Sequence, residues 1–386
     1  MAVTDRVVIG VDPHKASWTA AVVDAGLQPL DTLRVPVGAK GYRQLRRFAD
    51  RWSGATWAIE GAGGLGAPLL ARLAADGLDA VDVPAKLAAR VRLLSSGHGR
   101  KNDNADAISV GIAALTAPQL QTVQVDDAVA ALRALVEHRD DLVRAPTQTV
   151  NRLHALLTQL IPAGAPKSLT ADIAAQLLSR VRPHAPLQRT LRRLAADLIA
   201  EIRRLDRRIS TAGEDVAAAV TQAGCTLAEL YGIGAQLAGK ILARVGAVVR
   251  FRSAAAFAAF NGTAPIEVSS GDVVRHRLSR AGDRQLNSCL HIMAITQIRH
   301  NTPGRAYYQR KRAAGKSHKE ALRCLKRRLS DVIYRQLVSD AARRVTSPGG
   351  HVGATSRSSA PGSTPNAGSS DKSLPGPVDT DPTATS

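Results

Sequence analysis

The sequence predicts an α/β domain with a mixed sheet at the N-terminus, a helical middle and a mostly helical C-terminal part. Three observations lead to this prediction. Short Val- and Ile-rich runs alternate with helical patterns up to about residue 120, a seven-residue apolar repeat follows, and residues 226–346 are basic with helical periodicity. Apolar residues make up 45% of the 386 residues, which is enough for proper cores.

In residues 1–120 we expect five strands separated by helices. The strand candidates are RVVIGVD, SWTAAVVDA and DTLRVPVG at hairpin-like spacing, followed by ATWAIEG and LDAVDVP. The helix candidates are KGYRQLRRFADRW, LGAPLLARLAADG and AKLAARVRLLSS. Three early antiparallel strands followed by alternating helix and strand indicate a mixed sheet.

Residues 121–225 are expected to be helical and coiled-coil-like. The apolar residues that recur every seven positions are Val129, Val136, Val143, Val150 and Leu157. Pro146 interrupts this run, so we expect a kink or two stacked helices. A second helix carries an apolar stripe made of Leu198, Ile202, Leu205 and Ile209. The two runs can pair within one chain, as a helical hairpin, or between chains.

The positive charge is concentrated in one segment. The chain has a formal net charge of +20, and residues 226–346 hold 22 Lys and Arg against 7 Asp and Glu. Residues 1–120 hold 14 against 11. This asymmetry favours a nucleic-acid-binding module in 226–346. Residues 347–386 are rich in Ser, Gly, Pro and Thr and are expected to form a disordered tail.

Cysteine usage and hydropathy indicate where the protein resides. The three cysteines, Cys225, Cys289 and Cys324, are far apart and form no CxxC pair, which argues against a disulfide scaffold or a structural zinc site. No apolar run approaches the roughly 20 residues of a membrane span, and no signal peptide is recognisable. We therefore expect a cytoplasmic bacterial protein associated with the nucleoid, without a membrane partner.

Four acidic residues form the first candidate site. Asp12 ends the strand VVIGVD and Glu60 ends TWAIE, and strand-end acids are placed to meet a ligand. Asp103 and Asp106 lie one helical turn apart in KNDNADA. For this pair the alternative is an N-cap at Asp103 and a first-turn acid at Asp106.

Strand-end acids followed by a helix-borne pair, in the order Asp, Glu, Asp, Asp, are the layout of an RNase H-like, RuvC-like nuclease core. Carboxylate oxygens suit Mg²⁺, and two such ions about 3.5–4 Å apart stabilise the attacking and leaving oxygens of a phosphodiester. The sequence thus predicts Asp12, Glu60, Asp103 and Asp106 as catalytic metal ligands for two Mg²⁺ ions.

A second candidate site lies in the basic segment. LAELYGIGAQLAGKILARVG fits a helix-hairpin-helix in which Gly232 and Gly234 let backbone amides approach a phosphate, with Lys240 in the following helix. Beyond it come four further candidates for binding nucleic acid, Arg275, Arg277, Arg280 and Arg284. Between the two lies Ser269-Ser270-Gly271, which we interpret as a short polar loop and which by spacing alone is an ordinary turn.

The segments GVDPHK, WAIEG and KNDNADA resemble the motifs of the DEDD transposases of the IS110 insertion-sequence family, which include bridge-RNA-guided recombinases and pilin-gene invertases. Lys101, Asp103, Asp106 and Ala107 fit the third motif. The resemblance runs from about Val7 to Leu337 and extends to GTAPIEVSSG and RLSRAGDRQLN.

This resemblance implies that Ser270 is a catalytic serine that forms a transient covalent link with DNA, with Ser269 as the alternative. It also implies a homo-oligomer, dimer or tetramer, whose subunits share active sites, and a structured guide RNA beside the DNA. Two other functions stay open. One is a metal-dependent junction endonuclease, and the other is a non-enzymatic architectural protein that binds DNA or RNA.

Overall fold

The computed structural model describes residues 6–96, 102–117, 120, 122, 127–270, 273–277, 279 and 282–346. Residue contacts divide the chain into two units, Met1–Ala342 and Arg343–Ser386. The elements below belong to the first unit, apart from the last residues of the C-terminal helix. The expected disordered tail, 347–386, lies outside the described residues.

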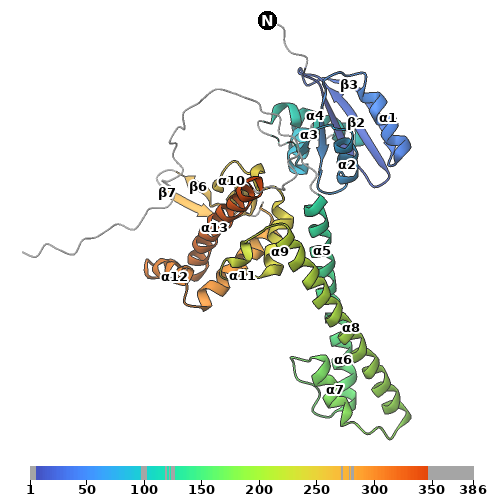
Figure 1. Ribbon diagram of the computed structural model, residues 1–386, viewed down its shortest axis with the longest axis vertical. Coiled ribbons are helices and arrows are strands. Elements are labelled where there is room, and N and C mark those ends of the chain that lie inside the picture. The colour runs from blue at the N-terminus through green and yellow to red at the C-terminus, as the bar shows by residue number, and fades with distance from the viewer. Residues whose placement is uncertain are drawn as a thin grey trace, which may run out of the picture. The chain divides into compact units, whose positions relative to one another are not determined.

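A five-stranded mixed sheet forms the N-terminal part of the chain (Figure 1). Its strands are β1 (Val8–Pro13), β2 (Ser17–Val23), β3 (Pro29–Pro36), β4 (Thr56–Glu60) and β5 (Ala80–Val83). They lie in the order β3-β2-β1-β4-β5; β2 is antiparallel to β1 and β3, while β4 is parallel to β1 and β5. All five predicted strands are confirmed, and their order is that of the RNase H-like domain expected from the sequence.

Helices cover both faces of this sheet (Figure 1). One face packs against α1 (Ala39–Ala49) and α2 (Ala67–Ala75), and the other packs against α3 (Ala85–Ser96) and α4 (Asp103–Thr116). Side chains alternate between the faces of a strand. Ile9 and Val11 accordingly join the core under α1 and α2, whereas Val8 joins the core under α4. Gly10 and Asp12 share the face of Val8, so β1 directs Asp12 toward α4.

The middle of the chain is helical, as predicted. It comprises α5 (Asp127–Arg144), α6 (Pro146–Leu160), α7 (Ala171–Ser179) and α8 (Pro186–Gln222). The helix break falls at Ala145, immediately before Pro146, which is the first residue of α6. Both α5 and α6 pack against α8 of the same chain, so the apolar stripes meet in an intramolecular hairpin. Pairing with a second chain stays a prediction.

The C-terminal part is mostly helical. After two short 3₁₀ turns, Leu227–Glu229 and Val248–Arg250, and the helices α9 (Ala235–Val245) and α10 (Ala254–Phe260), it contains the strands β6 (Ile266–Ser270) and β7 (Val273–Arg277). The helices α11 (Arg284–Arg299), α12 (Pro303–Ala313) and α13 (His318–Thr346) complete it. Across the described residues, no helix combines the length and apolar composition that crossing a bilayer requires.

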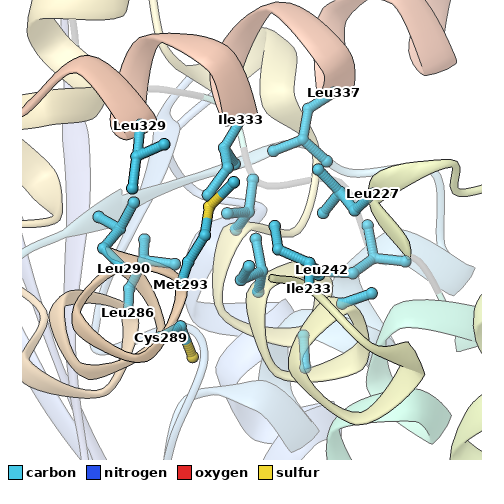
Figure 2. Close-up of a cluster of buried hydrophobic side chains, with 14 of the residues drawn as sticks. Leu227, Ile233, Leu242, Leu286, Cys289, Leu290, Met293, Leu329, Ile333 and Leu337 are labelled. Carbon is cyan, nitrogen blue, oxygen red and sulfur yellow. The ribbon is translucent and has the colours of Figure 1, made fainter. Parts of the chain in front are cut away.

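One large core holds the C-terminal part together. Figure 2 shows Leu329, Ile333 and Leu337, spaced four residues apart on α13, pointing toward leucines and Met293 of α11 and toward Leu242 of α9. The same cluster includes residues of the middle segment, namely Leu132 and Val136 of α5 and Val216 and Val220 of α8. This core crosses the predicted boundary at residue 225. The division into 1–120, 121–225, 226–346 and 347–386 stays a prediction.

The two serines of the Ser-Ser-Gly segment lie in a strand and not in the short polar loop expected from the sequence. Ser269 and Ser270 are the last residues of β6 and pair with Val274 and Val273 of β7. The β-branched residues around them, Val268, Val273 and Val274, favour this hairpin. Its two strands were not predicted.

Candidate metal and nucleic-acid sites

Two glycines set the approach of α4 to β1. A Cβ atom on Gly10 would lie 2.4 Å from the amide nitrogen of Gly111 and 2.5 Å from the carbonyl oxygen of Ala107. A Cβ atom on Gly111 would lie 2.6 Å from Cγ2 of Val23. Real Cβ atoms do not make such contacts, so α4 reaches the sheet only with glycine at both positions. This approach brings the first turn of α4 to the carboxyl end of β1.

Asp12, His14 and Asp103 meet at that point. Each offers one ligand atom, and the three atoms lie within 4.8 Å of one another. Nδ1 of His14 is 3.6 Å from Oδ2 of Asp12, and Nε2 is 3.8 Å from Oδ1 of Asp103. Asp12 is only 9% exposed. Two carboxylates and an imidazole at this spacing form a donor set for a divalent cation.

Asp103 is not the helix cap that the alternative interpretation assigned to it. Asn102 occupies the N-cap, and its Oδ1 accepts a hydrogen bond of 2.7 Å from the amide of Ala105. The carboxylate of Asp103 instead faces a side chain from the sheet, because Nη1 of Arg34 lies 2.8 Å away. Capping therefore does not explain Asp103.

Asp106 is buried one turn further along α4. It is 6% exposed and pairs with Arg92 of α3. This ion pair compensates the buried charge and ties α3 to α4. The three-residue donor set of Asp12, His14 and Asp103 does not include Asp106.

Glu60 lies at the same end of the sheet as Asp12. Val11 of β1 pairs in parallel with Ile59 of β4, and Asp12 and Glu60 are the next residues of these two strands. The carboxyl ends of neighbouring parallel strands meet at one edge of a sheet, as the sequence interpretation assumed. Glu60 is partly exposed and, like Asp106, lies outside the donor set.

The second candidate site is described only in part. The side chains of Ser269, Ser270 and Arg275 and the whole of Arg280 lie outside the described residues. Arg277 in β7 is exposed, and so is Arg284 at the start of α11. Asp283 caps α11 through its contact with the amide of Leu286 and also pairs with Arg244 of α9. Asp283 thus ties the start of α11 to α9.

The Gly-Ile-Gly turn follows a single 3₁₀ turn, Leu227–Glu229, and precedes α9. Gly232 has φ +89°, and Gly234 is the N-cap of α9. Nζ of Lys240 lies 2.6 Å from Oδ1 of Asp140 in α5. Lys240 therefore links α9 to α5, and its charge has a partner within the protein. The helix-hairpin-helix stays a prediction.

Sequence reasoning also passed over several polar groups. His14, Arg34 and Arg92 surround the acids, and each contact depends on the fold. In the C-terminal part, burial lowers the pKa of Lys326, whose Nζ donates a hydrogen bond to Asn287. Burial, then the charges of Lys326 and His318, lower the pKa of His291. The lowered pKa of Lys326 results from its burial, which no pattern in the sequence predicted.

Two family models match separate parts of the chain. Residues 9–162 match the sequence model of the DEDD transposases of IS110, and residues 225–309 match that of the transposase IS116/IS110/IS902 family. Among solved structures, the chain is similar to RuvC of Thermus thermophilus in complex with a Holliday junction, at 16% identity and a TM-score of 0.26. This match covers 31% of the present chain and 99% of RuvC.

Three insertion-element proteins are similar over most of their length. The IS116 protein of Streptomyces clavuligerus is 27% identical, over 86% of this chain and 95% of its own. The IS900 protein of Mycobacterium paratuberculosis is 27% identical, over 85% of this chain and 94% of its own. The IS110 protein of Streptomyces coelicolor is 28% identical, over 61% of this chain and 70% of its own. With both halves matched by transposase models and these relatives aligned across them, the chain belongs to the IS110 family of insertion-element transposases, enzymes that act on DNA.

Proposed function

We propose that this transposase is a DNA recombinase in which a divalent-metal site and a serine nucleophile act together. Asp12, Glu60, Asp103 and Asp106 hold Mg²⁺, two ions in the full site, and Ser270 attacks the DNA. The observation that supports this proposal best is the meeting of Asp12 and Asp103 at the carboxyl end of β1, where Asn102, not Asp103, caps the helix.

The residues present fit a divalent cation. Asp12 is 9% exposed at the end of an apolar strand, where a bound cation would offset the charge of its carboxylate. Bound cations would offset the charge that develops on the phosphate and the leaving oxygen. The fold contributes the rest: β1 and β4 fix two acids side by side, and the Gly10–Gly111 approach fixes the position of α4.

Ser270 performs the covalent step. Its oxygen forms a bond to phosphorus while the bond from phosphorus to a deoxyribose oxygen breaks. The hydroxyl proton leaves to solvent, and the released sugar oxygen takes up a proton. The phosphoserine ester keeps the energy of the phosphodiester. A hydroxyl of a new DNA end then attacks the ester, which joins the strands and regenerates serine.

The basic segment binds nucleic acid, both the DNA and a structured guide RNA. Helix α12, PGRAYYQRKRA, contains no acid, and Arg310, Lys311 and Arg328 gather around the ring of Tyr307. Cations gathered in this way suit a phosphate backbone. Gly232, Gly234, Lys240, Arg275, Arg277, Arg280 and Arg284 are the remaining proposed contacts.

The protein acts as a dimer or tetramer. Leu187 and Leu194 lie seven residues apart on α8 and are 66% and 39% exposed. Apolar residues at this spacing on a helix surface suit a second helix. The middle segment 121–225 is therefore the proposed site of self-association.

The covalent link tests the mechanism. Wild type incubated with labelled element-end DNA and Mg²⁺ should give a protein–DNA adduct on a denaturing gel. Ser270→Ala should bind the DNA but give neither adduct nor recombinant product, and Ser269→Ala should retain both at least in part. An adduct with Ser270→Ala would place the nucleophile elsewhere, and cleavage by wild type without any adduct would indicate a junction endonuclease.

A further inference from the structure

His14 lies between the two carboxylates of the candidate metal site. One ring nitrogen faces Asp12 at 3.6 Å and the other faces Asp103 at 3.8 Å. The backbone fixes this position, because the amide of His14 donates a hydrogen bond of 2.8 Å to the carbonyl oxygen of Ser17, the first residue of β2. The imidazole is therefore held over the end of β1 by a short hairpin.

The side chain has no structural role that accounts for this placement. Its exposed fraction is 42%, so it does not fill the core. Nδ1 is nevertheless buried and makes no hydrogen bond within the described residues. A buried nitrogen without a partner costs free energy, so the arrangement suits a ligand that supplies the missing contact.

A hydrogen-bonded bridge between the two carboxylates does not fit the distances. Both nitrogen–oxygen separations exceed the usual hydrogen-bond range of about 2.7–3.2 Å. Asp103 also has a cation already, since Arg34 contacts it at 2.8 Å. In contrast, a single ring nitrogen of His14 and one carboxylate oxygen from each aspartate lie within 4.8 Å of one another, a spacing at which three atoms can ligate one ion.

We propose that His14 is a nitrogen ligand of the cation held by Asp12 and Asp103, and that it shifts the metal preference of this site toward Mn²⁺. The inference rests on the metal site of the proposed function and adds to it a residue outside the four acids. Carboxylates suit Mg²⁺ and Mn²⁺ alike, whereas imidazole suits the transition metals. Adding one nitrogen ligand to two oxygen ligands therefore raises the affinity for Mn²⁺ more than the affinity for Mg²⁺.

Mn²⁺ binding to the untagged full-length protein tests this directly, because bound Mn²⁺ reports a coordinated nitrogen in pulsed electron paramagnetic resonance. Wild type should show nitrogen coupling, and His14→Ala should lose it. We expect His14→Ala to weaken Mn²⁺ binding about tenfold and Mg²⁺ binding less than about threefold, since only the imidazole contribution is lost. His138→Ala, which removes an exposed histidine of α5, is the matched control and should behave as wild type.

Asp12→Asn separates this inference from the proposal it rests on. It should abolish Mn²⁺ binding at the site while the far-ultraviolet circular dichroism of all variants stays that of wild type. If wild type binds Mn²⁺ through Asp12 but shows no nitrogen coupling, or if His14→Ala keeps the coupling, His14 is not a ligand and the carboxylate site stands. If wild type binds no Mn²⁺, both are overturned.

Discussion

The two glycines of the Gly-Ile-Gly turn differ in whether the fold requires them. Gly232 has φ +89°, and a Cβ atom there would lie 3.2 Å from the carbonyl oxygen of Met293, so the fold itself requires glycine. Gly234 has φ −90°, and a Cβ atom there would meet nothing within 4 Å. The fold does not explain glycine at 234, whereas the proposed close approach of a phosphate accounts for it. This position therefore tests DNA contact without disturbing the core.

We predict that Gly234→Asp leaves the melting temperature unchanged or higher and weakens DNA binding at least about fivefold. Aspartate is as good an N-cap as glycine or better, and its charge favours the helix N-terminus. The same carboxylate repels a phosphate bound there. Thermal denaturation and titration of labelled duplex at fixed salt measure the two effects.

Ser253→Asp is the matched control for Gly234→Asp. Ser253 caps α10 through the amide of Ala256, so aspartate keeps a cap and adds the same charge to the same basic segment. An equal loss of affinity in both variants would show that only net charge matters and would contradict a phosphate contact at the turn.

The sequence singled out the acids of the candidate metal site but not the residues that contact them. Asp12 was found because an acid ends an apolar strand, and Asp103 because it opens a helix in KNDNADA. Arg34 and Arg92 were missed because they meet the acids only after β3 and α3 have packed. His14 lies two residues from Asp12 within GVDPHK and carried a signal that went unused.

At the scale of elements, the seven-residue repeat of the middle segment does not mark the buried stripe throughout. Val136 is buried, but Val143 is 46% exposed, and its neighbour Leu142 is 6% exposed and packs with Leu205 and Ala212. A straight helix with 3.6 residues per turn drifts by about 20° per heptad. The stripe thus moves by one residue before the helix breaks at Ala145.

This shift predicts unequal effects for two neighbouring truncations. Leu142→Ala should lower the free energy of unfolding by about 2–4 kcal/mol, because it leaves a cavity between α5 and α8. Val143→Ala should cost less than about 1 kcal/mol, because its side chain is largely solvated. Chemical denaturation of both variants gives the comparison. Equal costs would mean that Val143 is buried by a second chain, as a strict coiled coil requires.

The elements were predicted well where one period dominates and poorly where the pattern is short. The five strands of the sheet and the helices over it follow apolar runs with clear glycine or proline boundaries. Strands β6 and β7 have five residues each and enclose Ser269-Ser270-Gly271, whose composition suggests a loop. The pairing of β6 with β7 depends on tertiary context, which runs of five residues do not reveal.

At the scale of the whole molecule, charge divides the chain more clearly than the cores do. The core that contains Leu227 and Leu286 also takes in Leu132 of α5 and Val216 of α8. The sequence could not show this, because apolar residues at helical spacing do not reveal which partner buries them. The charge asymmetry, in contrast, can be counted directly in the sequence, because residues 226–346 hold 22 Lys and Arg against 7 acids.

That asymmetry leads to a prediction about salt dependence in the full-length protein. Each neutralised phosphate contributes about 0.9 to the slope of log affinity against log salt concentration. Replacing Arg305 and Arg310, both exposed on α12, with glutamine should therefore reduce the magnitude of the slope by up to about 1.8. The matched pair Arg207→Gln and Arg208→Gln on α8 removes the same charge from an exposed surface outside the basic segment and should leave the slope unchanged. Titrations of one duplex at several salt concentrations provide both slopes. Equal reductions in the two variants would mean that DNA contacts the middle helices as much as the basic segment, and the assignment of nucleic-acid binding to 226–346 would fail.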